Sequence, residues 1–138
     1  MEINYLAVAL AVAAQFGIGF IWYGPIFGKL WGKIHGFDKL SKETQQKMMK
    51  EMGPFYGLQL LVTVLTTIVL AIFINNLPGW NPYGMAFFFW LGFVFPTQVS
   101  AVIFGGTPKE WITKKITVQA GAALVCYEAA AAILYYFA

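Results

Sequence analysis

One acidic residue, Glu128, lies inside an apolar segment that is long enough to cross a membrane. It precedes the end of that segment by roughly 7–9 residues, a depth of about 10–13 Å at the rise of an α-helix. An ionised carboxylate is costly in hydrocarbon, so an acid at this depth is a functional-site hypothesis. We expect Asn4, Tyr5, Asn75 or Asn76 to hydrogen-bond Glu128, because they lie nearest the same membrane face.

Three interpretations of Glu128 stay open at this point. The carboxyl group can be a proton- or cation-coupled site. It can instead be a protonated group that only holds helices or subunits together by hydrogen bonds. In the third interpretation the helix ends earlier than expected, and Glu128 lies among the lipid headgroups.

Each of the four apolar segments also contains one glutamine. Counted from the expected cytoplasmic ends, these residues lie roughly 5–10 residues in, which is about 8–15 Å. A buried amide is costly unless it is hydrogen-bonded, so we expect the side chains to point into the bundle. They can line a polar cavity open to the cytoplasm, or they can simply stabilise helix contacts. The four residues are Gln15, Gln59, Gln98 and Gln119.

Other chemistry is poorly represented in the chain. His35 is the only histidine and Cys126 the only cysteine, so a Cys/His metal cluster cannot be built. The pair His35 and Asp38 is isolated, and neither a phosphate-binding loop nor a nucleophile elbow occurs. We therefore expect no metal and no cofactor, and the sequence favours a protein that is not an enzyme. All nine basic residues are lysines, so nucleic acid is not an expected partner.

The composition is that of a membrane protein. Of the 138 residues, 59% are hydrophobic and 11% are charged, whereas soluble domains have about 45–50% and about 25%. The chain therefore lacks the polar residues that would cover a water-facing surface. Its start, Met1-Glu2, has no lysine before Lys29, so we interpret the first apolar segment as a retained helix rather than a cleaved signal.

The chain predicts an all-α membrane domain, 1–138, with four transmembrane helices. A span needs roughly 20 apolar residues, and the expected spans are 3–24, 54–76, 82–105 and 109–137.

Proline and capping residues predict where these helices begin, end and bend. Pro25 should end the first span, and Asn81 should cap the third. Pro96 should kink the third span, with Thr97 and Ser100 bonding the freed backbone groups. The fourth should begin with a capping box in which Thr107 caps the helix and Glu110 reaches back.

Residues 25–53 form the long connection, and we expect an amphipathic cytoplasmic helix there, from Ser41 to about Met52. It can lie on the membrane surface or dock a partner. Every lysine lies in this connection or beside the start of the fourth span. The positive-inside rule therefore places both lysine-bearing connections in the cytoplasm and both termini outside a cell membrane, the plasma or inner membrane.

Aromatic and small residues predict how the spans are anchored and packed. Tryptophan and tyrosine gather near the expected ends, where they should form an interfacial belt. This belt comprises Trp22, Tyr23, Trp31, Trp80, Tyr83, Trp111, Tyr135 and Tyr136. Two faces of small residues should make close helix contacts. These faces are Ala9, Ala13 and Gly17 in the first span, and Ala122, Cys126 and Ala130 in the fourth.

The opening stretch "INYLAVALAVAAQFGIGFIWYGPIFGKLWGK" resembles the family called "domain of unknown function 1761". The resemblance rests on an early asparagine, an aromatic helix exit and the F-G-K-x-W motif that follows it. These positions are Asn4, Trp22, Tyr23, Gly24, Pro25, Phe27, Gly28, Lys29 and Trp31. It implies a small four-helix membrane protein along the whole chain and supplies no activity.

Two functions are consistent with these features. The first is a small oligomeric transport or permeation protein, with a polar cavity for a small molecule or an ion and with Glu128 as a titrating group. The second is a membrane interaction or scaffold protein, in which the buried polar residues only fix helix packing. Its lysine-rich loop would dock a partner or anionic lipid. Four helices enclose little volume, so we expect a homodimer or larger homo-oligomer in either case.

Overall fold

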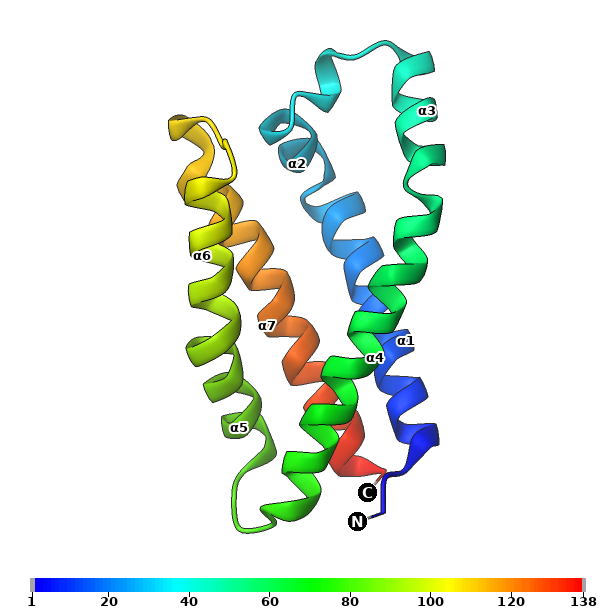
Figure 1. Cartoon of the computed structure of the whole chain (residues 1–138), viewed down its shortest axis with the longest axis vertical. Helices are drawn as coiled ribbons and strands as arrows, with labels where there is room; N and C mark the ends of the chain where they lie inside the picture. Colours follow the sequence, from blue (N-terminus) through cyan, green and yellow to red (C-terminus); the bar gives the residue numbers. More distant parts are fainter. Residues whose placement is uncertain (1, 138) are drawn as a thin grey trace.

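The computed structural model describes residues 2–137, and every regular element in that range is a helix. Four helices are long and apolar enough to cross a membrane, which confirms the predicted number of spans. They are Tyr5–Ile26, Gly53–Asn76, Pro82–Phe104 and Lys109–Tyr136. The two ends of the chain lie together at one end of the bundle (Figure 1).

Two of the four spans contain a five-residue π-helix, at the end of the first span and in the middle of the third. The first consists of α1 (Tyr5–Ile21) and the π-helix η1 (Trp22–Ile26). The second is the unbroken helix α4 (Gly53–Asn76). The third consists of α5 (Pro82–Phe89), the π-helix η3 (Trp90–Val94) and α6 (Phe95–Phe104). The fourth consists of the short 3₁₀ helix η4 (Lys109–Trp111) and α7 (Ile112–Tyr136).

The long connection contains three short helices. They are α2 (Gly28–Ile34), the 3₁₀ helix η2 (Phe37–Lys39) and α3 (Lys42–Glu51). The expected cap of α3 is confirmed, because the Ser41 hydroxyl accepts a hydrogen bond from the Thr44 N–H at 3.3 Å. Met48, Met49 and Met52 are exposed, so nothing in the described chain covers this side of the connection.

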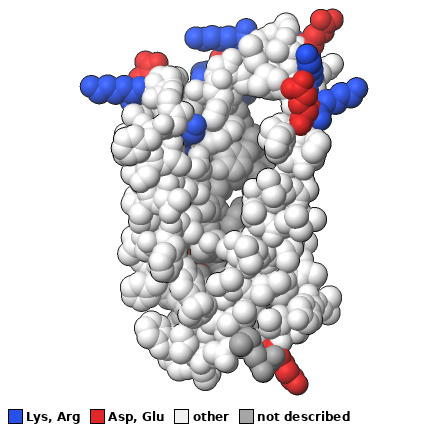
Figure 2. All heavy atoms as spheres, viewed as in Figure 1, with Lys and Arg blue, Asp and Glu red and all other residues white. Residues whose placement is uncertain are grey.

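Helix α7 is the centre of the bundle and contacts all three other spans (Figure 1). The buried core lies near the end that holds the chain termini. It consists mainly of small and branched side chains: Ala7, Val8, Ala11, Val12, Leu70, Ala71, Ile74, Met85, Ala86, Ala130, Ala131 and Leu134. At the other end the spans separate, and residues 53–62 of α4 are all exposed. All lysines belong to elements at this separated end, which we call the lysine-rich end (Figure 2).

Within the described chain, the side of α1 that packs is not the predicted contact face. Ala9, Ala13 and Gly17 are exposed, whereas Ala7 and Ala11 are 1% and 0% exposed. The two sets differ by two positions, which is about 200° around a helix. The α7 face fits better, since Ala122 and Ala130 are buried and Cys126 is half-buried.

Helix boundaries near proline also differ from the expectation. Pro25 does not end the span but lies inside η1, where the Phe27 N–H donates to the Trp22 carbonyl oxygen at 2.9 Å. The wider π turn shifts the hydrogen bonds by one residue, so the missing N–H of proline is tolerated. Pro96 begins α6 directly after η3, and the Thr97 hydroxyl donates to the Phe93 carbonyl oxygen at 2.5 Å, as expected of Thr97. The Ser100 hydroxyl makes no hydrogen bond within residues 2–137.

The predicted capping box at the fourth span is wrong. Pro108 has φ −56° and ψ 138°, and the helical turn begins after it at Lys109. Proline thus occupies the capping position, and Thr107 lies one residue too early to reach the free N–H groups. The Thr107 hydroxyl is buried without a partner in the described chain. The caps at Asn4 and Asn81 do form, the latter as predicted.

Candidate functional site

Helix α4 carries a polar ridge from Gln59 to Asn75. Gln59, Thr63, Thr67, Ala71 and Asn75 follow one another at four-residue spacing, which places neighbours on the same side of a helix. Four of the five side chains are polar. We call this set the α4 ridge.

The middle of the α4 ridge is hydrogen-bonded to α1. Gln15 Nε2 donates to Thr67 Oγ1 at 2.8 Å and to the Ala11 carbonyl oxygen at 3.2 Å. Thr67 Oγ1 in turn donates to the Thr63 carbonyl oxygen at 2.7 Å. Gln15 and Thr67 are 8% and 1% exposed. The pairing therefore satisfies two polar groups that would otherwise be costly inside the bundle.

The ridge becomes accessible toward the lysine-rich end. Gln59 is exposed, and its Nε2 donates to Thr63 Oγ1 at 3.2 Å. The Thr63 hydroxyl donates to the Gln59 carbonyl oxygen at 2.7 Å. Gln15 and Gln59, both predicted from the sequence, thus lie on one hydrogen-bonded path through the two threonines. The surface is hollowed between the two sides of the bundle in this view (Figure 2).

The other two glutamines lie on other helices. Gln98 is half-buried on α6, and its Oε1 is buried without a partner in the described chain. Gln119 is half-buried on α7 and makes no hydrogen bond within residues 2–137. No hydrogen bond joins either to the α4 ridge.

Glu128 lies on α7 and has no hydrogen bond to the α4 ridge. It is half-buried, and its carboxyl group makes neither a hydrogen bond nor an ion pair within residues 2–137. It also lines neither of the two hollows described below. Among the described residues, its side chain is therefore without a polar partner.

No hydrogen bond joins Glu128 to any of its predicted partners within residues 2–137, and the three asparagines among them bond elsewhere. Asn4 Oδ1 accepts from the Ala7 N–H at 3.1 Å, and Asn4 Nδ2 donates to the Phe137 carbonyl oxygen at 2.6 Å. The amides of Asn75 and Asn76 also bond to backbone groups, as described next. Tyr5 is 71% exposed.

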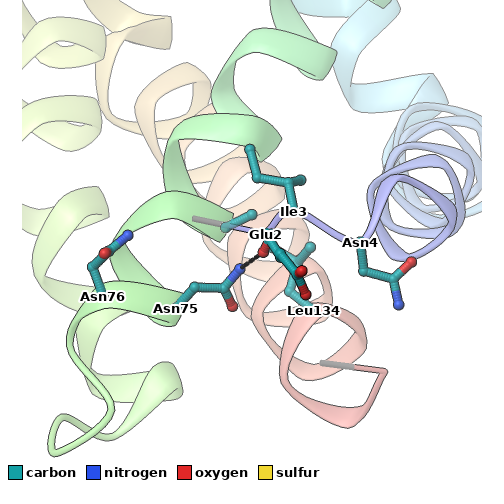
Figure 3. Close-up of a pocket in the computed structure, with 7 residues that line it drawn as sticks. Glu2, Ile3, Asn4, Asn75, Asn76 and Leu134 are labelled. Carbon is teal, nitrogen blue, oxygen red and sulfur yellow. Dashed lines mark hydrogen bonds between the residues drawn. The ribbon is translucent and has the colours of Figure 1, made fainter.

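A cavity of ≈ 500 Å³ opens at the end where the chain termini lie (Figure 3). Asn75 Nδ2 donates to the Glu2 carbonyl oxygen at 3.0 Å, and Asn76 Nδ2 donates to the Ile72 carbonyl oxygen at 2.7 Å. Ala71 and Asn75 belong both to this cavity and to the α4 ridge, so the ridge ends in the cavity. We call it the terminal cavity; it is lined by Glu2, Ile3, Asn4, Ala71, Asn75, Asn76 and Leu134.

Two tryptophans hold α7 from neighbouring spans. Trp22 Nε1 donates to the Val118 carbonyl oxygen at 2.8 Å, and Trp90 Nε1 donates to the Ala120 carbonyl oxygen at 2.9 Å. Each tryptophan is the first residue of a π-helix. A Cβ atom on Gly121 would lie 3.1 Å from Trp22 Cζ2, so this close approach favours glycine. A second hollow, ≈ 380 Å³ and mainly apolar, lies beside Trp90 between α6 and α7.

This tryptophan pair was not predicted from the sequence. Trp22 was expected only in the interfacial belt, and no role was expected for Trp90. A usable signal exists, because the letters WYGPIF at 22–27 and WLGFVF at 90–95 share the pattern W-x-G-x-I/V-F. Both copies form a π-helix, an element that often marks functional positions.

An aromatic stack lies at the lysine-rich end. The ring centroids of Tyr23 and Trp31 are 4.8 Å apart, and those of Trp31 and His35 are 4.5 Å apart. Lys115 Nζ lies 5.8 Å from the Trp31 ring centroid. Partial burial lowers the pKa of His35, and the nearby Lys115 ammonium lowers it further. Within residues 2–137 no three His, Cys, Asp or Glu side chains are close enough to hold a metal ion.

Comparison with known proteins identifies a family and no close characterised relative. The model of a family described as "Protein of unknown function (DUF1761)" matches residues 6–135, nearly the whole chain. No curated protein matches the sequence, and no solved structure matches the fold. The family resemblance noted in the opening motif is thereby confirmed.

Proposed function

The chain belongs to the DUF1761 family, whose function is unknown. Because the family supplies no activity, we propose a function from the geometry of this chain: it is a small membrane transport or permeation protein. A small polar molecule or an ion would move along the α4 ridge between the terminal cavity and the lysine-rich end.

The α4 ridge is the observation that supports this proposal. Polar side chains in a membrane helix are costly and usually face a partner or an aqueous path. Here they continue at every fourth position from exposed Gln59 to Asn75, interrupted only by Ala71. If these polar side chains only stabilised a helix contact, the buried pair Gln15 and Thr67 would be sufficient. The extension in both directions is what a solute path needs.

A second copy of the chain would complete this path. Residues 53–62 of α4 are exposed, so one chain leaves the ridge open on one side at the lysine-rich end. Symmetric pairing is the usual way for a small chain to close such a path. The exposed face of Ala9, Ala13 and Gly17 permits the close helix approach that such pairing in a membrane requires.

Glu128 is the candidate for proton coupling in this proposal. It has no partner within the described chain, and a carboxyl group at this depth favours a role in proton or cation movement over a passive one. The substitution Glu128→Gln keeps the shape and removes the titration, so it should abolish pH-dependent flux while leaving the oligomeric state unchanged.

The proposed location follows from the charges. Figure 2 shows the coloured lysines gathered at one end of the molecule. By the positive-inside rule this end faces the cytoplasm, and the terminal cavity and both chain ends face outward. The membrane would be a plasma or inner membrane.

Flux through reconstituted protein tests the proposal. Proteoliposomes would be assayed for urea flux by light scattering and for proton and potassium flux with entrapped dyes. Thr67→Val removes the central hydroxyl of the ridge at nearly constant volume and should lower flux. The matched control is Thr117→Val on α7, because Thr117 is exposed and bonds only the Thr113 carbonyl oxygen, at 2.8 Å. Wild-type vesicles indistinguishable from empty ones would refute transport of these three solutes.

The gathered lysines favour a second candidate, a membrane interaction protein. A cluster of lysines beside the membrane attracts anionic lipid. Three methionines that a partner could cover, Met48 and Met49 of α3 and the adjoining Met52, are exposed. Replacing Lys42, Lys47 and Lys50 with glutamine should then weaken enrichment of phosphatidylglycerol around the protein in mixed nanodiscs. Transport in the vesicles described above would be unaffected by these changes, which separates the two candidates.

A further inference from the structure

We propose that the second hollow, between α6 and α7, binds one acyl chain of an anionic phospholipid whose headgroup lies beside the lysines at the start of the fourth span. We call this hollow the α6–α7 groove. It is separate from the α4 ridge, so such a site requires that the chain spans a membrane but not that the ridge conducts a solute.

The α6–α7 groove is long and mainly apolar. It has a volume of ≈ 380 Å³ and is open on one side. Helix α7 forms one wall from Thr113 to Leu124, which is three turns and roughly 16 Å at the rise of an α-helix. Trp90 and Phe95 form the opposite wall, with their ring centroids 5.2 Å apart. The helices α6 and α7 lie side by side there (Figure 1).

The Trp90 indole fixes the middle of the groove. Its Nε1 donates to the Ala120 carbonyl oxygen at 2.9 Å, so the ring is held against α7. Ala120 is 3% exposed and contributes only a methyl group to the lining. No large α7 side chain therefore fills the groove at this level, and the space stays open to a ligand.

The size of the groove favours an acyl chain over a helix of another protein. Three turns of an α-helix about 10 Å wide occupy about 1,300 Å³, more than three times the volume of the groove. A single acyl chain is much narrower than a helix. Ile116 and Leu124 are half-buried in the lining and would give such a chain an apolar surface to cover.

The polar groups lie at one end of the groove, as a phospholipid requires. Lys109 precedes Thr113 by four residues and Lys114 follows it directly. Lys114 Nζ lies 5.2 Å from the Trp111 ring centroid, and tryptophan and lysine are typical of the headgroup level. The Thr113 hydroxyl makes no hydrogen bond within residues 2–137, so it can donate to a phosphate or ester oxygen. A lipid with its headgroup here would extend its chain toward the apolar end of the groove.

The charge at this end favours an anionic headgroup. Lys109 and Lys114 are exposed, and the exposed acid Glu110 lies between them in the sequence, which leaves one net positive charge. Neither lysine forms an ion pair within residues 2–137. Lys115 is placed differently, because its Nζ lies 5.8 Å from the ring centroid of Trp31 on α2. One net positive charge matches phosphatidylglycerol, whereas phosphatidylcholine is neutral overall.

Native mass spectrometry of the purified full chain tests the proposal. Detergent removes lipids that only surround a membrane protein, and a retained lipid is identified by its mass. The chain would be incubated with equal amounts of phosphatidylglycerol and phosphatidylcholine that carry the same acyl chains. It should retain phosphatidylglycerol about fivefold more often, the factor that corresponds to one net charge at about 1 kcal/mol.

Two pairs of variants separate the headgroup from the acyl chain. Lys109→Gln with Lys114→Gln should remove the preference for phosphatidylglycerol, whereas Lys29→Gln with Lys33→Gln on α2 should leave it unchanged. Thr113→Phe should lower retention of both lipids at least about tenfold, the factor that corresponds to about two displaced CH₂ groups. Its matched control is Thr97→Phe, because Thr97 is also exposed but does not line the groove.

Either of two results overturns the proposal. In the first, the wild type retains phosphatidylcholine as often as phosphatidylglycerol. In the second, Thr113→Phe retains as much phosphatidylglycerol as Thr97→Phe. All the replaced lysines and threonines are exposed, so these variants change the site without removing a buried contact.

Discussion

The hydrogen bond between Gln15 and Thr67 gives a direct test of how the bundle is held together. Thr67 is 1% exposed, and its hydroxyl both accepts from Gln15 Nε2 and donates to the Thr63 carbonyl oxygen. Thr67→Val keeps the shape of the side chain and removes both bonds. The Gln15 amide then keeps only the Ala11 carbonyl oxygen, at 3.2 Å.

The expected loss in unfolding free energy is about 1–2 kcal/mol. A buried donor left without its partner costs about 1–3 kcal/mol, but measured hydrogen bonds between membrane helices average about 0.6 and reach about 1.7 kcal/mol. The bond that Gln15 retains argues for the lower part of the first range. The control Thr117→Val removes a bond within one exposed helix turn and should cost less than about 0.5 kcal/mol.

Unfolding by sodium dodecyl sulfate in mixed micelles, followed by circular dichroism, would measure these losses. The double variant Gln15→Leu with Thr67→Val removes both partners, so it should be more stable than the sum of the single losses predicts. If Thr67→Val costs no more than Thr117→Val, or if the two single losses simply add, Gln15 and Thr67 do not form the stabilising pair described here.

Three further predictions concern other contacts. Gly121→Ala should cost about 1 kcal/mol of unfolding free energy, because its Cβ would meet the Trp22 ring. Adding Trp22→Phe should restore part of this loss. If it restores none, the loss does not come from a clash with Trp22. Burial and a nearby lysine lower the pKa of His35. Its contribution to the free energy of unfolding is therefore complete above pH 6.5 and declines as the pH falls below that value. His35→Gln should remove this pH-dependent part of the unfolding free energy. Asn4→Ala should cost about 1–2 kcal/mol, because it removes a helix cap and the bond to the Phe137 carbonyl oxygen, and faster hydrogen exchange at both chain ends would report it.

Local features of the sequence predicted local features of the fold. The apolar lengths gave four spans, and Ser41 and Asn81 cap helices as expected, because a cap depends on only the next few residues. The fourth span shows the limit of such reasoning. The letters around Thr107 fit a capping box, but the extended backbone of Pro108 moved the helix start by one residue.

The candidate site could be predicted only in part. Gln15 points into the bundle as expected and its amide is paired, since a buried amide is costly without a partner, whereas Gln59 is exposed and bonds Thr63 on its own helix. The hydroxyl group that each amide bonds depends on how the helices are arranged. Gln15 and Thr67, for example, are 52 positions apart in the sequence. The Trp22 indole and the Val118 carbonyl oxygen are 96 apart, and nothing near either residue indicates the other.

The sequence by itself determined that the chain forms four helices long and apolar enough to cross a membrane, with its lysines at one end, because hydrophobicity and charge act on each segment separately. Only the tertiary structure decided which side of each helix faces inward. Small residues recur at four-residue spacing on two sides of α1, so periodicity could not choose between Ala9 with Ala13 and Ala7 with Ala11. The choice follows the side that also carries Gln15, because burying that side lets the amide reach Thr67 instead of lipid.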